Sequence, residues 1–228
     1  MSEARTFDPV WEERFSRGHF SRYPWDVVVS FVFSNYPRHK PRREVRIFEA
    51  GCGAGNNLWF AAREGFLVGG VDASPTAIAN ARKRFEEEGL SGDFRTGDFT
   101  RLPFESDTFD LALDRAAITC CGFSAARAAV AEVRRILVPG GRFFFNPYSD
   151  RHSSFVSGHY GPDGLKVDIG EGTLVGVGQI YFYSRREVDA LFSEGWKLLS
   201  VQHLEIAEQL RPEYLVHAEW RVVAEKVE

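Results

Sequence analysis

The chain has 228 residues, of which 44% are hydrophobic and 26% are charged, and its formal net charge is −4. This length and composition suit one globular domain, and no run approaches the roughly 18 apolar residues that a membrane helix needs. The acidic balance disfavours a protein that wraps a nucleic-acid backbone, because such proteins gather Lys and Arg on one face. Residues 1–6 are polar and lack the pattern of a secretory signal, so we expect a cytoplasmic protein.

The cysteines and the one basic run have structural interpretations. Cys52, Cys120 and Cys121 are odd in number and two are adjacent, which disfavours a disulfide framework and favours reduced thiols. No Cys-x-x-Cys or His-x-x-x-His spacing occurs, so we expect no metal site. The basic run at 38–43 is expected to be a solvated linker.

From Val45 onward, short apolar runs alternate with helix-like segments, which is typical of an α/β fold with a parallel sheet covered on both faces. Ser74 with Pro75 predicts a capped helix start, and Ser124 is a second expected N-cap. Gly65 and the Pro-Gly-Gly turn at 139–141 are expected to end helices. We expect strands at 45–48, 67–71, 93–96, 109–113 and 142–146, and helices at 56–64, after Pro75, and from Ser124 to about Leu137.

Two segments break this alternation. Residues 149–183 contain seven glycines between Gly158 and Gly178 and are expected to be an insertion. The apolar run 25–33 fits a helix or a strand, and we favour a helix because Pro24 suits a first turn and a strand there has no evident partner. The remaining expected elements are a helix at 184–192 and strands at 196–206 and 217–226. The chain is thus expected to be one domain, 1–228, made of an N-terminal lid (1–44), a core (45–148), an inserted lid (149–183) and a C-terminal part (184–228).

The loop that follows the first expected strand carries the strongest functional signal. Glycines at 51, 53 and 55 let the backbone turn sharply and let a ligand approach closely. A dinucleotide fingerprint needs its third glycine three positions after Gly53, so the spacing disfavours NAD. Asp72, at the end of the second strand, is placed to accept hydrogen bonds from both hydroxyls of a ribose. Glu49 would repel a pyrophosphate but suits a cationic sulfonium and an amino group.

Four segments resemble the class I S-adenosylmethionine-dependent methyltransferases in order and spacing, over roughly residues 45–150. They are Glu49-Ala-Gly-Cys-Gly-Ala-Gly55, Gly70-Val-Asp-Ala-Ser-Pro75, Gly97-Asp-Phe-Thr-Arg-Leu-Pro-Phe104 running into Thr108-Phe-Asp110, and Arg134-Arg-Ile-Leu-Val-Pro-Gly-Gly141. The resemblance implies a Rossmann-like sheet of seven mostly parallel strands whose last strand is antiparallel, with helices on both faces. It also implies S-adenosylmethionine as the cofactor, S-adenosylhomocysteine as its product, and methyl transfer by in-line displacement.

The resemblance further implies which residues hold this cofactor. Glu49, Gly51 and Gly53 would line its methionine part, and Asp72 would hold the ribose. Asp98 would accept from the adenine amino group while Phe99 covers the ring. The full expected set at the cofactor is Glu49, Ala50, Gly51, Cys52, Gly53, Asp72, Ala73, Asp98, Phe99 and Asp114.

The acceptor side has weaker signals. Asp114 and Arg115 follow the fourth strand, and ligands lie outside the carboxyl ends of parallel strands, so we expect Arg115 to contact the acceptor. The segments 1–44 and 149–183 occur where the family builds a lid, with Tyr23, Trp25 and Tyr160 as candidate aromatic walls. A hydroxyl acceptor requires a base within about 3 Å. The candidates for that base are His152, His159 and Tyr160, followed by His19, whereas His203 and His217 lie in strands and are expected to be structural.

The expected function is methyl transfer to oxygen or nitrogen of a small molecule or of a sugar on a carrier, because no separate target-recognition domain is evident. Two other classes stay open: a non-catalytic binding protein with this fold, and a nucleotide-dependent oxidoreductase. Asn146-Pro147-Tyr148 lacks the second proline of the Asn-Pro-Pro-Tyr motif and follows the fifth strand, so we interpret it as a strand-end turn. The sequence carries no signal for the oligomeric state.

Overall fold

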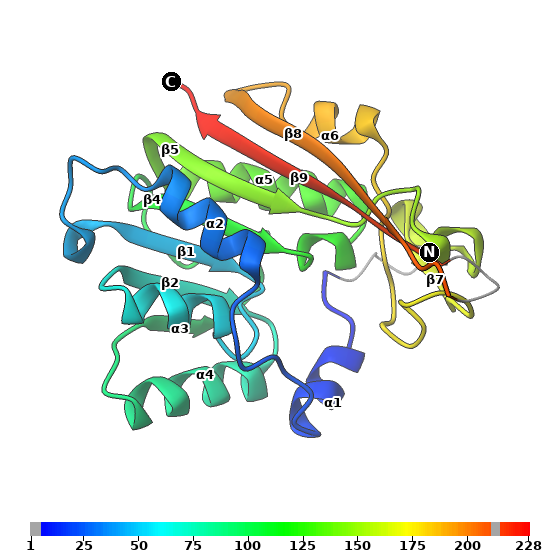
Figure 1. Cartoon of the computed structure of the whole chain (residues 1–228), viewed down its shortest axis with the longest axis horizontal. Coiled ribbons are helices and arrows are strands. Elements are labelled where there is room, and N and C mark those ends of the chain that lie inside the picture. The colour runs from blue at the N-terminus through cyan, green and yellow to red at the C-terminus, as the bar shows by residue number, and fades with distance from the viewer. Residues whose placement is uncertain (1–5, 211–214) are drawn as a thin grey trace.

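The structure, a computed structural model, describes residues 6–210 and 215–228. Its main sheet has seven strands in the order β3-β2-β1-β4-β5-β9-β8 (Figure 1). β1 to β5 pair in parallel, and β9 runs antiparallel to both of its neighbours. This confirms the expected Rossmann-like sheet with an antiparallel last strand. The strands of this sheet are β1 (Arg46–Ala50), β2 (Leu67–Asp72), β3 (Asp93–Thr96), β4 (Phe109–Arg115), β5 (Leu137–Asn146), β8 (Trp196–Ala207) and β9 (Val216–Lys226).

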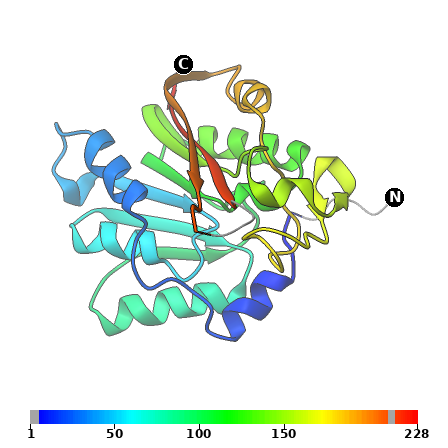
Figure 2. The same ribbon diagram turned by 45° about the vertical axis from the view of Figure 1, so that its right-hand side comes forward.

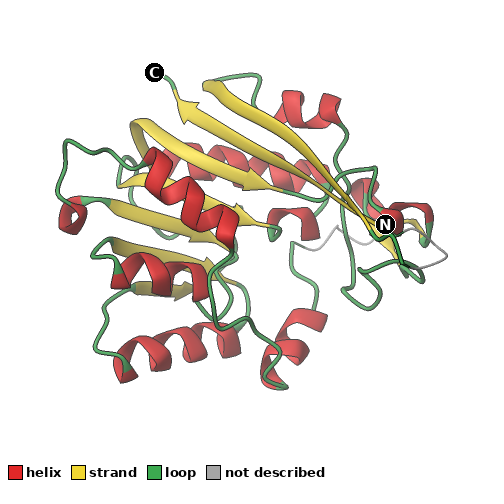
Figure 3. Cartoon of the chain, in the orientation of Figure 1, coloured by secondary structure: helices red, strands yellow, loops and turns green. Residues whose placement is uncertain are grey.

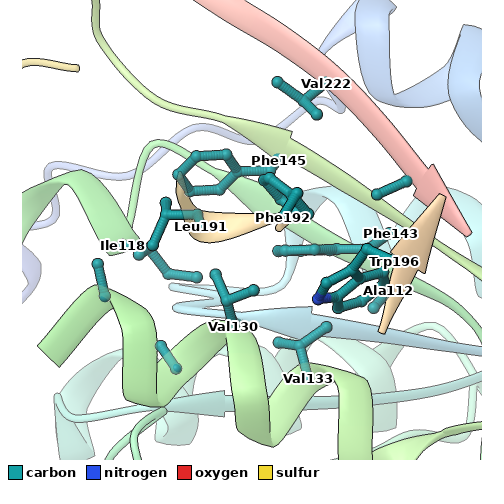
Figure 4. Packing of buried hydrophobic residues seen from close by; sticks show 14 of the residues in the cluster. Ala112, Ile118, Val130, Val133, Phe143, Phe145, Leu191, Phe192, Trp196 and Val222 are labelled. Atoms are coloured by element: carbon teal, nitrogen blue, oxygen red, sulfur yellow. The ribbon is translucent and has the colours of Figure 1, made fainter. Parts of the chain in front are cut away.

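Helices cover both faces of the sheet, as Figures 1 and 3 show. Side chains alternate along a strand, so Ile47 of β1 packs with α2, α3 and α4, and Phe48 faces the opposite layer with α5 and α6. In that second layer Val130 and Val133 of α5 meet Phe143 and its neighbours (Figure 4). Burying each such side chain contributes roughly 1.5–3 kcal/mol to the free energy of unfolding. The helices are α1 (Val10–Ser16), α2 (Asp26–Asn35), α3 (Asn56–Arg63), α4 (Pro75–Glu87), α5 (Phe123–Ile136) and α6 (Arg185–Leu191), with short 3-10 turns at Arg42–Glu44, Ile118–Cys120, Ser153–Val156 and Pro162–Gly164.

The expected helix starts are confirmed at α4 and α6 but not at α5. The Ser74 hydroxyl accepts from the Ala77 N–H at 3.0 Å, and Ser184 forms a capping box with Glu187. Gly122, not Ser124, is the N-cap of α5. The Ser124 N–H and hydroxyl instead donate to the Asp163 carboxylate, a partner 39 residues away that no local pattern reveals.

Two other boundaries also differ from expectation. β5 begins at Leu137 and not at Arg142, because Leu137 is extended and pairs with Phe109 directly after α5 ends. The run 25–33 is helical, as expected, but Pro24 precedes the N-cap residue Trp25 and lies outside the first turn. A neighbouring element acts at both boundaries: β4 pairs with Leu137, and the Trp25 N–H donates to the Asn57 side chain of α3 at 3.0 Å.

The N-terminal helix α1 and the 149–183 insertion lie together at the carboxyl end of the sheet (Figure 2). The insertion has its own two-stranded sheet, β6 (His159–Tyr160) and β7 (Lys166–Val167). It also has its own hydrophobic cluster, against which Trp11 of α1 packs. The Arg14 guanidinium donates to the Gly176 carbonyl at 2.9 Å. α1 and the insertion therefore form one continuous roof, whereas α2, which also belongs to the expected 1–44 segment, packs on the face of the sheet.

The basic run lies before the start of β1, at the other end of the sheet, and it is not merely the solvated linker that the sequence predicts. Lys40 pairs with Asp110 at 2.5 Å, and Arg42 pairs with Glu64 at 2.8 Å. All three cysteines are free thiols and buried. Within the described ranges, no helix combines the length and the apolar character that crossing a membrane requires.

Candidate functional site

The glycine loop between β1 and α3 is shaped by left-handed backbone conformations. Gly51, Gly53 and Gly55 have φ of +63°, +53° and +74°, which other residues rarely adopt. A Cβ on Gly51 would lie 2.2 Å from the Cβ of Ala117, and one on Gly53 would lie 3.3 Å from the Phe15 ring. The loop is thus closely covered by the β4 end on one side and by α1 on the other.

Glu49 is a buried carboxylate behind this loop. Its Oε1 accepts from the Asn57 amide at 2.6 Å, and its Oε2 is buried without a partner among the described residues. Burial raises the pKa of Glu49 to about 8, against the hydrogen bond from Asn57 that lowers it, and the charges of Asp114 and Asp72 raise it further. An unpartnered buried acceptor of this kind suits a cationic ammonium group.

Asp114, the penultimate residue of β4, is likewise a buried carboxylate with hydrogen bonds to only one of its two oxygens among the described residues. Its Oδ1 accepts from the N–H groups of Ala117 and Ile118 at 3.0 and 2.9 Å, and its Oδ2 is buried without a partner among the described residues. Burial raises the pKa of Asp114 to about 6 despite those two N–H donors. The carboxylate shapes the turn that presents Ala117 to Gly51, so its first role is to hold the loop geometry.

Asp72 is the last residue of β2, and Asp98 follows the neighbouring strand β3. The Asp72 oxygens accept from the N–H groups of Gly53 and Ser74 at 2.9 and 2.8 Å. A carboxylate has about four acceptor sites, so Asp72 keeps capacity for hydroxyl donors on the cavity that it lines. Asp98 instead accepts from Thr100 and from the hydroxyl of Thr6 in the lid, and it is not on the cavity wall.

A cavity of about 130 Å³ lies between this loop and the lid; we call it the cofactor cavity. Its wall includes Gly51, Asp72, Ala73 and Phe99 from the expected cofactor set. Glu49, Cys52 and Asp114 are buried behind that wall, and Ala50 and Gly53 complete the loop. The full lining is Thr6, Phe7, Asp8, Trp11, Phe15, Gly51, Asp72, Ala73, Phe99, Arg115, Ala116, Ala117 and Cys120.

The lid helix α1 is fastened to the N-terminus of α4 through one side chain. The Glu12 carboxylate accepts from the hydroxyls of Ser74 and Thr76, the cap and first-turn residues of α4. These hydrogen bonds lower the pKa of Glu12, and the positive end of the α4 dipole favours a carboxylate there. The connection holds Phe15 over Gly53.

A second cavity of about 410 Å³ adjoins the first; we call it the acceptor pocket. The two share Trp11, Arg115, Ala116 and Cys120, so the acceptor pocket meets the cofactor cavity where β4 ends. The lining of the acceptor pocket is Trp11, Trp25, Arg115, Ala116, Cys120, Tyr148, Leu174, Val177, Ile180 and His217.

The polar side of the acceptor pocket is built around a buried carboxylate, Glu219. The His217 Nε2 lies 3.1 Å from a Glu219 oxygen, Arg221 donates to the other oxygen at 2.7 Å, and Arg115 lies 3.5 Å away. Burial alone would raise the pKa of Glu219, but the hydrogen bond from His217 and the charges of Arg115 and Arg221 lower it to about 2. The ionised carboxylate therefore orients both His217 and Arg115.

Two of the expected acceptor residues line the pocket. Arg115 lies there with its guanidinium 4.3 Å from the centre of the Trp25 ring, and Trp25 itself is on the wall. Tyr23 is 68% exposed and packs on Trp59 outside the pocket. His19 is exposed and is likewise not among the lining residues.

The insertion candidates also lie off the pocket wall. His159 is exposed beside Asp168, and Tyr160 covers the Lys166 ammonium at 4.2 Å from its ring centre. His152 is buried, and its Nδ1 accepts from the Ser154 N–H at 3.0 Å. Burial and the neighbouring His217 lower the pKa of His152 to about 4. His152 is therefore neutral, and its Nδ1 is already engaged by the Ser154 N–H.

Sequence reasoning missed the residues that close the site. Trp11, Phe15 and Tyr148 were not identified, and His217 was interpreted as structural although the structure places it on the pocket wall. One signal was present: His217 and Glu219 are two residues apart in a strand, so they share one face. The insertion side chains Leu174, Val177 and Ile180 carried no such pattern.

The fold and site define a Rossmann-like cofactor-binding domain of the methyltransferase type. Residues 47–141 match the family model of the methyltransferase domain, so this core is similar to the class I S-adenosylmethionine-dependent methyltransferases. The expected resemblance is confirmed by this match and by the strand order.

Individual relatives agree over the same core. An uncharacterized methyltransferase, YodH, of Bacillus subtilis is 31% identical over 44% of this chain and 42% of its own length. A malonyl-[acyl-carrier protein] O-methyltransferase of Erwinia pyrifoliae is 31% identical over 52% of this chain and 43% of its own. These alignments span less than half of each relative.

Among solved structures, the Burkholderia thailandensis 1,6-didemethyltoxoflavin-N1-methyltransferase with bound 1,6-didemethyltoxoflavin and S-adenosylhomocysteine is similar in fold. Its TM-score is 0.67 at 17% identity, over 100% of this chain and 94% of that one. The similarity therefore extends the shared fold beyond the matched core to the lid segments and the C-terminal strands.

Proposed function

We propose that the protein transfers a methyl group from S-adenosylmethionine to oxygen or nitrogen of a small-molecule acceptor held in the acceptor pocket. The observation that carries this is the junction of the two cavities at Arg115 and Ala116, beside the glycine loop and the unpartnered Glu49 oxygen. One cavity alone would suit a binding protein; two adjoining cavities under one roof suit a transfer between two ligands.

The chain's residues fit the cofactor in three ways. The unpartnered Glu49 Oε2 supports contact with an ammonium group, Asp72 on the cavity wall supports contact with ribose hydroxyls, and Gly51 lines the same cavity without a side chain. When bound, S-adenosylmethionine supplies a methyl group on a sulfonium that is already activated. The chain then has to align the acceptor and exclude water, which is the role of the joined roof of α1 and the insertion.

The relatives' names describe both oxygen and nitrogen acceptors, which supports the reaction class without selecting the atom. The aromatic and aliphatic walls of the acceptor pocket favour an apolar body over a bare sugar; for a sugar on a carrier, the carrier would have to supply the apolar contact.

Isothermal titration of the purified chain with S-adenosylhomocysteine and with NAD tests the proposal. We expect binding of S-adenosylhomocysteine in the micromolar range and none of NAD. Methyl-labelled S-adenosylmethionine incubated with small-molecule and macromolecular extract fractions should then label the small-molecule fraction. NAD binding without S-adenosylhomocysteine binding would indicate an oxidoreductase, and cofactor binding without label transfer to any fraction would indicate a binding protein.

A further inference from the structure

The acceptor pocket has an uneven distribution of charge. Eight of its ten described lining residues are aromatic, aliphatic or thiol side chains, and the other two are Arg115 and His217. No carboxylate is among these described lining residues; Glu219 is 2% exposed and lies behind the wall. The pocket thus presents positive charge and apolar surface to its ligand, which favours an oxygen anion on an apolar body and disfavours an ammonium group.

His217 is held in the arrangement of a general base. Because Glu219 is ionised and can only accept, the neutral His217 carries its proton on Nε2, which leaves the lone pair on Nδ1. The ring is fixed by edge-on contacts with Tyr148 and His152, at centroid distances of 5.8 and 5.3 Å. The side chain is 31% exposed and lines the pocket, so it can reach a bound ligand.

The charged and titratable groups around His217 come from three elements. Glu219 lies on its own strand β9, Arg115 on β4, and Tyr148 and His152 in the segment after β5. His152 is neutral, and burial raises the pKa of Tyr148. Of the two histidines, only His217 lines the pocket, because His152 is buried and its Nδ1 is engaged by the Ser154 N–H.

We propose that the acceptor is an apolar, ring-sized molecule with an acidic hydroxyl group, and that His217, oriented by Glu219, removes the hydroxyl proton. This deepens the proposed function and rests on it. His217 Nδ1 takes the proton while the acceptor oxygen bonds to the methyl carbon, and the breaking C–S bond leaves its electron pair on sulfur. Arg115 stabilises the developing oxygen anion, and the imidazolium returns its proton to water.

The test uses three probes with the same ring: 4-nitrophenol, 4-nitroaniline and 4-nitrobenzoate. Each is titrated into the full chain saturated with S-adenosylhomocysteine, so that no turnover occurs. The phenolate of 4-nitrophenol absorbs visible light, so its ionisation in the pocket is read directly. We expect 4-nitrophenol to bind more tightly than 4-nitroaniline. We also expect the pKa of 4-nitrophenol to fall by about one unit when it binds.

Two variants separate a base from a structural residue. His217→Gln should return the pKa of bound 4-nitrophenol toward its solution value and slow methyl transfer to it by about 10²- to 10⁴-fold. It should leave the affinity for S-adenosylhomocysteine within about twofold, which also shows that the chain is folded. The matched control is His203→Gln on β8, because His203 contacts Ser149 and Glu205 outside the pocket and should change neither quantity.

The outcomes are distinct. If the unaltered chain does not bind S-adenosylhomocysteine, the proposed function itself is overturned. If that binding is intact, 4-nitrophenol bound without ionisation, equal binding of 4-nitroaniline, or no binding of 4-nitrophenol at millimolar concentration would overturn only the present inference. Tighter binding and faster methylation of 4-nitrobenzoate, unaffected by His217→Gln, would also overturn it, because a carboxylate needs no base.

Discussion

The cofactor cavity and the acceptor pocket adjoin, yet they are built from different material. Apart from its roof, the cofactor cavity is formed by loops and buried carboxylates of consecutive βα units, all within residues 49–120. The acceptor pocket is walled by side chains from α1, the start of α2, the insertion and β9, which are up to about 200 residues apart in sequence. The first site depends on local backbone geometry, and the second depends on how distant segments pack.

Gly51→Ala should have the largest effect, because it changes the backbone geometry on which the cofactor cavity depends. The new Cβ would meet the Ala117 Cβ at 2.2 Å, and φ of +63° is strained for alanine. Strain and overpacking together should lower the free energy of unfolding by roughly 2–4 kcal/mol. Calorimetric titration should show S-adenosylhomocysteine affinity reduced at least about 100-fold.

Gly170→Ala is the matched control for that substitution. No atom lies within 4 Å of its added Cβ, and its φ is not in the left-handed region. Thermal unfolding and cofactor affinity should therefore stay unchanged. A Gly51→Ala protein with normal affinity would show that the packing of the glycine loop against Ala117 does not shape the cofactor cavity.

Glu49→Gln should have the next largest effect. A carboxylate must ionise to pair with an ammonium group, and the pKa of Glu49 is about 8. Cofactor binding should therefore release a proton at pH 7, and affinity should fall up to about tenfold for each pH unit below 8. Glu49→Gln should weaken binding by roughly 10- to 100-fold and abolish this pH dependence, as titrations between pH 6 and 9 would show.

The same residue predicts an opposite effect on stability. The pKa of Glu49 is raised in the folded chain above its ordinary 4.5, so the folded state binds the proton more tightly. Its contribution to the free energy of unfolding is fully present below pH 4.5 and is lost as the pH rises to about 8. Without cofactor, Glu49→Gln should therefore raise the melting temperature at pH 8. A lower melting temperature there would mean that the carboxylate has a structural partner.

These differences explain what could be predicted from the sequence. Gly51, Asp72 and Phe99 all line the cofactor cavity, and their positions could be predicted because motifs of a few residues determine the turns that hold them. The start of β5 could not be predicted, because Leu137 pairs in the β4 ladder before the Pro-Gly-Gly turn. The place of His217 on the pocket wall could not be predicted either, because its neighbours Arg115 and Tyr148 are brought to it by the order of strands β4-β5-β9.

Glu12→Gln should have a smaller effect, because it weakens the attachment of α1 to α4 without removing a side chain that lines either cavity. The carboxylate accepts from Ser74 and Thr76, and an amide at that position keeps one acceptor but loses the charge that the α4 N-terminus favours. We expect about a three- to tenfold loss of S-adenosylhomocysteine affinity and faster amide hydrogen exchange in α1. The matched control is Glu13→Gln on the same helix, whose carboxylate pairs with exposed Arg17. Equal effects of the two substitutions would contradict the proposed fastening.

Asp163→Ala should have the smallest effect and would sharpen the comparison most, since it concerns how the insertion is supported. The carboxylate accepts from the Ser124 N–H and hydroxyl at 2.8 and 2.9 Å and so caps α5 from a distance. Loss of a cap costs about 1 kcal/mol in the free energy of unfolding. Asp168→Ala is the control, because Asp168 has nearly the same left-handed φ, 52° against 53°, but is exposed and caps no helix. The difference between the two melting curves isolates the cap from the backbone strain. If the insertion supports only the acceptor pocket, the Asp163→Ala protein should keep its affinity for S-adenosylhomocysteine and bind 4-nitrophenol more weakly. Weaker binding of both ligands would mean that the insertion supports both cavities. The two cavities would then differ in the residues that line them but not in what holds them in place.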